Sequence, residues 1–296
     1  MKKLFLLTSV FLINTLLMVS CSEQHKGLQL QEEIKGHLFI IGGGSRPAYM
    51  MEKYIELAGG RENAKIIIIP FAGADVYNTG VSLVNQFKKN GCENTHFAFF
   101  NQGEADFVDN LNVLEGATGI YFCGGRQTRH TKMLLGTQFI EKIREIYVKG
   151  GVIGGTSAGA AIMSEIMLNG EELVDTDNSS SNAFSSIKKD NIGTTEGFGF
   201  LKNVIVDQHF VARKRMNRLL SLVIENQMPG IGIDEATALI VKPDLSFEVL
   251  GESCVMVFEP DKNFLSRTDK NGHLSADRII TRILLSGDTF KLAGSK

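Results

Sequence analysis

The sequence predicts an α/β protein with a doubly wound, mostly parallel sheet and a β-rich C-terminal addition. From residue 36 onward, short apolar runs alternate with longer amphipathic segments. This alternation is typical of strands that are buried on both faces and joined by covering helices. The composition is that of an ordinary globular protein, because 43% of the 296 residues are hydrophobic and 22% are charged.

The N-terminal segment is predicted to target the protein rather than to belong to its fold. Lys2 and Lys3 precede an apolar run over residues 4–19, as in a signal peptide. The run is short for a membrane span, which needs about 20 apolar residues. Residues 17–21 read LMVSC and resemble a bacterial lipobox, with Met18 where leucine is usual.

We therefore expect residues 1–20 to be a signal peptide, Cys21 to be lipidated, and residues 21–35 to be the lipidated tether. An uncleaved anchor helix is the alternative. Either arrangement predicts an exported protein that is anchored to a membrane, on its periplasmic or cell-surface face.

The remaining chain, residues 36–296, is expected to form a single α/β domain. Strands are predicted at 37–41, 65–69, 94–100, 119–123, 151–153 and 203–206, and helices at 48–58, 80–90, 138–149, 158–168 and 212–227. Residues 169–199 interrupt this alternation, and the aperiodic polar stretch at 175–182 predicts a loop. Between 231 and 258 the pattern favours further strands, with turns at 242–245 and at Gly251.

Charge and cysteine content exclude some functions. The net charge of -2 provides no basic surface for nucleic acid. With Cys21 set aside for lipidation, an odd number of cysteines remains, and their spacing is not that of metal ligands: Cys92, Cys123 and Cys254. We expect Cys123 and Cys254 to be buried free thiols because they lie in apolar runs. Cys123 as a nucleophile is the alternative.

The best candidate nucleophile is Ser157. Ligands of open α/β sheets bind outside the carboxyl ends of the strands, and residues 155–159 read GTSAG between a short predicted strand and a helix. This is the context of a nucleophile elbow, where flanking glycines permit a tight turn and the helix N-terminus supplies amides. The alternative is that Ser157 or Thr156 only caps the helix.

A base, an acid and oxyanion donors are also available at strand ends. His209 follows the 203–206 strand, 52 residues beyond Ser157, and is the best-placed histidine. Asp234 and Glu235 end an apolar run, and either could orient the imidazole; a polar turn is the alternative. The amide of Ala158 and one from Gly124 or Gly125 are candidate oxyanion donors. The glycines at 42–44 lack a phosphate-binding pattern and are interpreted as making room at the mouth of the site.

Four segments resemble the cyanophycinase and dipeptidase E family of serine peptidases, and the resemblance spans about residues 36–258. They are GGTSAGA at 154–160, DQHFVARKRMNR at 207–218, GIDEATA at 232–238 and GGRQ at 124–127, and the histidine segment is closer to cyanophycinase. The resemblance implies a hydrolytic domain with a fold like that of class I glutamine amidotransferases (flavodoxin-like). It implies Ser157, His209 and Glu235 as the catalytic triad, with Gly125 and Ala158 as our candidates for the oxyanion hole. It also implies no metal or organic cofactor, and a substrate pocket shaped by Gln127, Asp207, Gln208, Arg213, Arg215 and Arg218.

Two positions depart from the family pattern, and they bear on the substrate. Arg126 stands where Asp is usual, and Asn217 where cyanophycinases usually have Gly. We expect some of the three arginines to receive a substrate carboxylate; a solvated face, or internal pairing with Asp207 or Glu235, is the alternative.

The leading interpretation is an exopeptidase for β-aspartyl peptides such as β-linked aspartyl-arginine. An aspartyl dipeptidase of the same family is the runner-up. A catalytically silent, exported binding lipoprotein is a third reading, which the presence of Ser, His and acid together disfavours. The expected partners are a peptide substrate and a membrane lipid anchor but no nucleic acid, with a homodimer as one candidate assembly.

Overall fold

The structure is a computed structural model that describes residues 33–174, 184 and 186–292. The chain divides into two compact units, Met1–Glu33 and Ile34–Lys296. The predicted signal peptide, Cys21 and the tether up to residue 32 lie outside the described residues. Ile34 packs against the hydrophobic core, and the amide of Lys35 donates to the carbonyl of Val148 at 3.2 Å, so the folded unit begins at Ile34. None of the described helices has the length and hydropathy needed to cross a bilayer.

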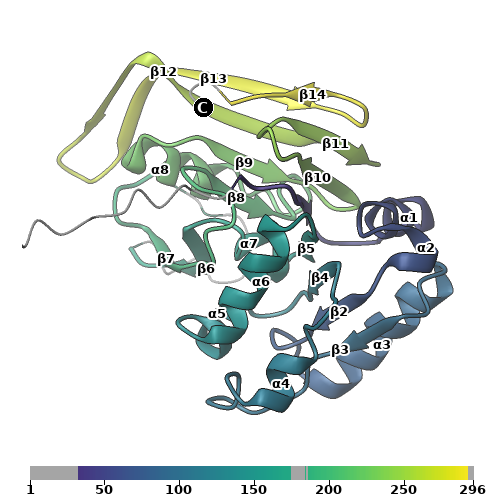
Figure 1. Cartoon of the computed structure of the whole chain (residues 1–296). Coiled ribbons are helices and arrows are strands. Elements are labelled where there is room, and N and C mark those ends of the chain that lie inside the picture. Colours follow the sequence, from purple (N-terminus) through teal and green to yellow (C-terminus); the bar gives the residue numbers. More distant parts are fainter. Residues whose placement is uncertain (1–32, 175–183, 185, 293–296) are drawn as a thin grey trace, which may run out of the picture. The chain divides into compact units, whose positions relative to one another are not determined.

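The core of the second unit is an eight-stranded, mixed sheet with strand order β14-β11-β10-β1-β5-β4-β2-β3 (Figure 1). The five strands from β1 to β3 in this order are parallel to their neighbours, and the other three extend the β1 edge in antiparallel pairing. The predicted mostly parallel α/β sheet is thus confirmed. The strands are β1 (His37–Ile41), β2 (Ile66–Ile69), β3 (Thr95–Phe97), β4 (Gly119–Phe122), β5 (Val152–Thr156), β10 (Thr237–Val241), β11 (Phe247–Gly251) and β14 (Thr289–Phe290).

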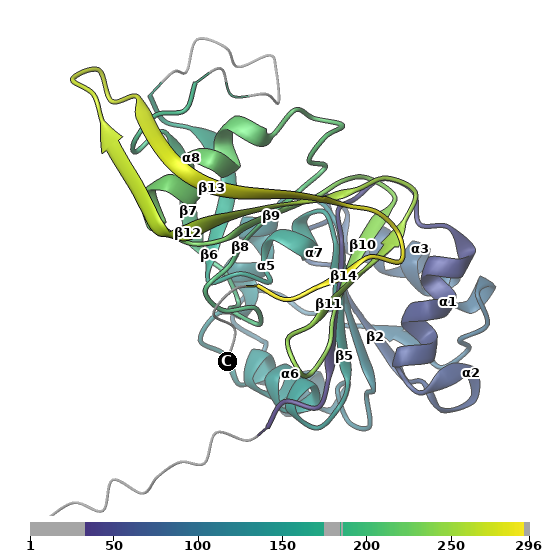
Figure 2. The same ribbon diagram turned by 90° about the horizontal axis from the view of Figure 1, so that it is seen from above.

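Helices cover both faces of this sheet, as Figure 2 shows from above. In β1, Phe39 and Ile41 pack with one group of helices, whereas Leu38 and Ile40 pack with the other. Both faces are buried because successive side chains of a strand point to opposite sides, which explains why the parallel strands read as continuous apolar runs. The helices on the first face include α1 (Ala48–Leu57) and α3 (Val76–Lys89); those on the second include α5 (Gln127–Leu134) and α6 (Gln138–Val148); α2 (Gly60–Asn63) and α4 (Val108–Asn112) are short.

A second sheet of four strands has the order β13-β12-β9-β8 and packs against helix α8. We expected the strand at 203–206 to continue the main sheet, and this was wrong. Both edges of β1 are already occupied by β10 and β5, and β8 pairs in parallel with β9 instead. The elements are β8 (Ile205–Gln208), α8 (Met216–Asn226), β9 (Gly230–Ile233), β12 (Val255–Thr268) and β13 (Leu274–Leu284).

The helix predicted at 158–168 is only one turn long, because α7 comprises Ala158–Ala161. The carbonyls of Ile162, Met163 and Ser164 accept from the amides of Phe198, Leu201 and Gly199. These long-range bonds replace the intrahelical ones. The chain then enters strand β6 (Ile166–Glu172), which pairs with β7 (Ile192–Glu196). The predicted loop at 169–199 is therefore partly a two-stranded sheet, and its polar stretch at 175–182 lies outside the described residues.

Helix α8 begins at Met216 rather than at residue 212. Lys214 has a φ of 52°, which a right-handed helix excludes. The amides of Val211 and Ala212 donate to the carboxylate of Asp234 at 3.0 and 2.9 Å instead of joining the helix. Arg213 and Arg215 therefore precede the helix, contrary to the helix predicted at 212–227.

Candidate active site

Ser157 occupies a strained turn between β5 and α7. Its backbone angles, φ 54° and ψ -107°, are rarely adopted by a residue with a side chain. A methyl group on Gly155 would collide with the carbonyl of Gly159, and one on Gly159 would collide with the carbonyl of Phe122. The glycines of the GTSAG segment are therefore required by close backbone approach. The turn is held by the Ser157 amide, which donates to the carbonyl of Ile41 at 3.0 Å.

Three side chains form one hydrogen-bonded chain at the strand ends. His209 Nε2 lies 2.8 Å from Ser157 Oγ, and His209 Nδ1 lies 2.5 Å from Glu235 Oε1. Ser157 follows β5, whereas His209 and Glu235 follow β8 and β9, which are parallel neighbours. With a proton on Nδ1, the imidazole donates to Glu235 and accepts the serine proton at Nε2, which is the arrangement of a nucleophile, base and orienting acid.

The glycine run after β1 packs against this chain. A side chain on Gly43 would collide with the His209 ring, and one on Gly44 would approach Glu235 too closely. The His209 amide donates to the carbonyl of Gly42 at 2.7 Å. These glycines thus make room for the side chains of His209 and Glu235.

The two adjacent acids have different contacts. Glu235 faces His209, whereas Asp234 accepts from the backbone of Val211 and Ala212 and from the Ser253 hydroxyl at 2.6 Å. Asp234 therefore holds the segment after His209, and Glu235 is the acid that can orient the imidazole. Sequence reasoning alone left this choice open.

Burial lowers the pKa of His209 below the ordinary value of 6.5, and the positive charges of Arg213 and Arg215 lower it further, while the hydrogen bond to Glu235 opposes the shift. The imidazole is therefore neutral at neutral pH. A neutral imidazole is the form that can accept a proton from Ser157.

This pKa shift predicts the acid limb of the pH–rate profile. kcat/KM should fall as pH drops through the His209 pKa, with a midpoint below 6.5. In Arg213→Gln one positive neighbour is gone, so the imidazolium forms more easily and the limb should move to higher pH. Arg213→Lys keeps the charge and should leave the limb in place. The prediction is checked by kcat/KM profiles of the three proteins between pH 4 and 8, and an unmoved limb in Arg213→Gln would contradict it.

Backbone amides are available for an oxyanion. Ala158 is the first residue of α7, so its amide has no acceptor within the helix. Gly124 lies against the elbow, since a Cβ built on it would be 3.5 Å from that of Ser157. Gly125 has a φ of 135° and no room for a side chain beside Ala72. The oxyanion roles of Ala158 and Gly125 stay predictions.

Gln208 contacts Ser157, whereas Gln127 has a different partner. Gln208 Oε1 lies 3.4 Å from Ser157 Oγ, and this long contact is weaker than the bond to His209. Gln127, at the start of α5, donates through Nε2 to the carbonyl of Leu168 at 2.7 Å. Gln127 therefore ties α5 to β6 and is buried.

Asp207 and two of the three arginines form a buried network. Arg218 Nε donates to Asp207 Oδ2 at 2.7 Å, and its terminal nitrogen donates to Oδ1 of the same carboxylate. Arg215 Nη1 donates to the carbonyl of Gln208 at 2.7 Å and lies 3.9 Å from Asp207. The side chains of Asp207, Arg215 and Arg218 are 1%, 7% and 4% exposed. Their charges therefore interact with one another rather than with solvent. Only Arg213 of the three arginines is partly exposed.

A cavity of about 550 Å³ opens beside Ser157 and includes both Ser157 and His209 in its lining. Cys123 also lines it, but burial raises the pKa of this thiol to about 11. A protonated thiol is a poor nucleophile, which disfavours the alternative reading of Cys123.

The lining includes four polar side chains that sequence reasoning missed. Arg46 lies two residues beyond the glycine run that follows β1, which was a usable signal, whereas Asn78, Thr79 and Ser82 lie on α3 and have no distinctive pattern.

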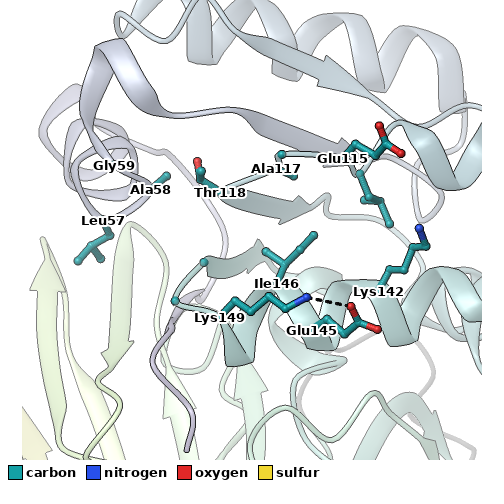
Figure 3. A pocket seen from close by; sticks show the side chains of 14 residues that line it. Leu57, Ala58, Gly59, Glu115, Ala117, Thr118, Lys142, Glu145, Ile146 and Lys149 are labelled. Carbon is teal, nitrogen blue, oxygen red and sulfur yellow. Dashed lines mark hydrogen bonds and ion pairs between the residues drawn. The ribbon is translucent and has the colours of Figure 1, made fainter. Parts of the chain in front are cut away.

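A second cavity of about 500 Å³ lies at the amino ends of β4 and β5, away from the serine (Figure 3). Lys149 on its rim donates to Glu145 at 3.2 Å. None of its described lining residues is a serine, histidine or cysteine, so it offers no comparable chemistry.

Comparison with known proteins finds a matching family, related sequences and a similar fold. The sequence model of peptidase family S51 matches residues 38–248. The cyanophycinase of Trichormus variabilis is 31% identical over 282 residues, covering 91% of this chain and 90% of the relative. The cyanophycinase of Synechococcus elongatus is 29% identical over 267 residues, covering 87% and 80%. The crystal structure of a peptidase from an acI-B1 actinobacterium has a similar fold, with a TM-score of 0.65, 22% identity and coverage of 88% of this chain and 99% of that one.

Proposed function

The chain belongs to peptidase family S51 and is a serine-type peptidase, and we propose that it is an exopeptidase that hydrolyses β-aspartyl bonds, of the β-Asp-Arg type or a related one. The observation that carries this proposal is the hydrogen-bonded chain from Ser157 through His209 to Glu235. The β-aspartyl specificity is supported by relatives that are themselves named cyanophycinases. The finer fold class, that of class I glutamine amidotransferases, is part of the proposal and is supported by the elbow in a parallel sheet.

The reaction follows from the contacts. The Ser157 hydroxyl gives its proton to His209 Nε2 while Oγ attacks the carbonyl carbon of the scissile amide. The amide of Ala158 and one from Gly125 stabilise the oxyanion. His209 then protonates the leaving amine, the C–N bond breaks, and an ester to Ser157 remains. Water gives a proton to His209 and attacks the ester carbon. The bond from this carbon to Ser157 Oγ then breaks, and His209 returns the proton to Oγ. Glu235 stabilises the imidazolium in both steps.

A binding protein without activity is the alternative from another class. Such a protein has no need of a strained serine in hydrogen-bond contact with a histidine that is itself oriented by a carboxylate. An aspartyl dipeptidase of the same family would use the same three residues, so only the preferred substrate distinguishes it from the proposed exopeptidase.

A serine-directed organophosphonate, followed by mass spectrometry, tests the enzyme class. We expect one label per chain, on Ser157, and none on Ser157→Ala. Hydrolysis of β-aspartyl-arginine and of its α-linked isomer tests the bond type, and the β-isomer should be cleaved faster. An unlabelled wild-type protein that cleaves neither dipeptide would favour the binding protein, and preference for the α-isomer would favour the dipeptidase.

Export and lipidation at Cys21 remain part of the proposal, and their support is the N-terminal sequence alone. A fatty-acid analogue supplied to cells should label the wild-type protein and not Cys21→Ser, while both should hydrolyse the same dipeptide. A wild-type protein without label would favour the anchor helix.

A further inference from the structure

Arg46 places a positive charge in the cavity beside the nucleophile. Because the imidazole of His209 is neutral, Arg46 is the only charged residue among the described residues that line this cavity. It is half-buried, and no carboxylate of the described part of the chain forms an ion pair with it. An arginine in a pocket without an acid is suited to an anionic group of a ligand.

The guanidinium is held in place from one side. Arg46 Nε donates to Gln86 Oε1 at 3.1 Å, which leaves its two terminal amino groups for another partner. Gln86 lies on the same face of α3 as Thr79 and Ser82, which line the cavity. Asp75 caps this helix and offsets its N-terminal dipole, so the helix end adds little to the positive charge of Arg46.

The charge of Arg46 acts on the floor of the cavity. Burial raises the pKa of Cys123 and of Tyr121, and Arg46 opposes the rise at both. Cys123 and Ser157 line the same cavity. The positive charge of Arg46 would therefore also be felt by a substrate bound in this cavity.

The arginines that we expected to receive a carboxylate are less suitable. Arg218 is buried in a bidentate pair with Asp207, and Arg215 is buried and bonded to the carbonyl of Gln208. Arg213 is partly exposed but does not line the cavity. We propose that Arg46 binds a free carboxylate of the peptide substrate, close to the scissile amide, and so makes this enzyme selective for acidic peptides. This inference rests on the proposed function and deepens it, because it names the residue that recognises the substrate's charge.

The test compares β-aspartyl-arginine with its two monoamides, one at the aspartyl α-carboxyl and one at the C-terminus. Wild type should lose roughly ten- to a hundredfold in kcat/KM on one of the two monoamides, as expected for a charge-assisted bond. Arg46→Gln should lose about as much on the diacid and should no longer distinguish it from that monoamide. Arg46→Lys should recover part of the discrimination because it keeps the charge without the fork. Arg61→Gln, which removes an exposed arginine paired with Glu52, is the matched control and should behave as wild type.

Calorimetric titration of the same three dipeptides into Ser157→Ala and Ser157→Ala/Arg46→Gln gives a readout that does not require turnover. The proposal would be supported if Ser157→Ala bound the diacid more tightly than one of its monoamides and Ser157→Ala/Arg46→Gln did not. Equal binding by both proteins, or unchanged discrimination in Arg46→Gln, would overturn it. Failure of the proposed function looks different, because the phosphonate would then leave wild type unlabelled.

Discussion

Ser157→Ala is expected to lower kcat/KM by roughly 10⁴- to 10⁶-fold, the range seen when the nucleophile of a serine hydrolase is removed. The substitution deletes one oxygen and its contacts with His209 and Gln208. The backbone strain at this position is the same for alanine, and the amide bond to Ile41 remains, so the protein should stay folded. Steady-state kinetics on β-aspartyl-arginine, with circular dichroism and thermal unfolding as the control for folding, measures both effects.

His209→Ala should be nearly as damaging, and the double variant Ser157→Ala/His209→Ala little worse than either single one. Residues that act as one unit are strongly non-additive. Glu235→Gln should lose less activity, because the amide oxygen can still accept a hydrogen bond from Nδ1 although it cannot stabilise the imidazolium by charge. Two single losses that simply multiply in the double variant would mean that His209 is not the base for Ser157.

Asp207→Leu is expected to lower the free energy of unfolding by about 3–5 kcal/mol, because it leaves the buried guanidinium of Arg218 without its carboxylate. Both side chains are almost completely buried, and their bond is bidentate. Arg215, which lies 3.9 Å from the same carboxylate, would add a second uncompensated charge nearby. Urea unfolding followed by circular dichroism gives the free energy.

A double variant provides the control for this pair. Asp207→Leu/Arg218→Met removes both charges and should be more stable than Asp207→Leu, since replacing a whole buried pair by apolar groups is often tolerated. Breaking the exposed pair of Glu52 and Arg61 by Arg61→Gln should change stability little. If the double variant lost as much free energy of unfolding as Asp207→Leu and Arg218→Met lose in sum, Asp207 and Arg218 would not be stabilising each other.

Sequence alone was enough for the features that depend on neighbouring residues. Strands buried on both faces appear as continuous apolar runs, so the parallel α/β sheet could be predicted and is present. The elbow at Ser157 was readable because its glycines are needed for backbone contacts within a few residues and with the adjacent strand. Placing His209 at a strand end was likewise a local inference, and the structure brings its ring to Ser157.

Tertiary structure decided every feature that depends on which distant segments meet. Periodicity reports burial but not pairing, so β8 was assigned to the wrong sheet and α7 was predicted too long. The adjacent acids Asp234 and Glu235 look equivalent in sequence, and only the packing after β9 directs one to His209 and the other to the backbone. The same holds for charge: the sequence shows where arginines are, but an ion pair depends on distances across the fold. Arg218 is thus neutralised by Asp207, while Arg46, to which the sequence assigned no role, lines the cavity beside Ser157.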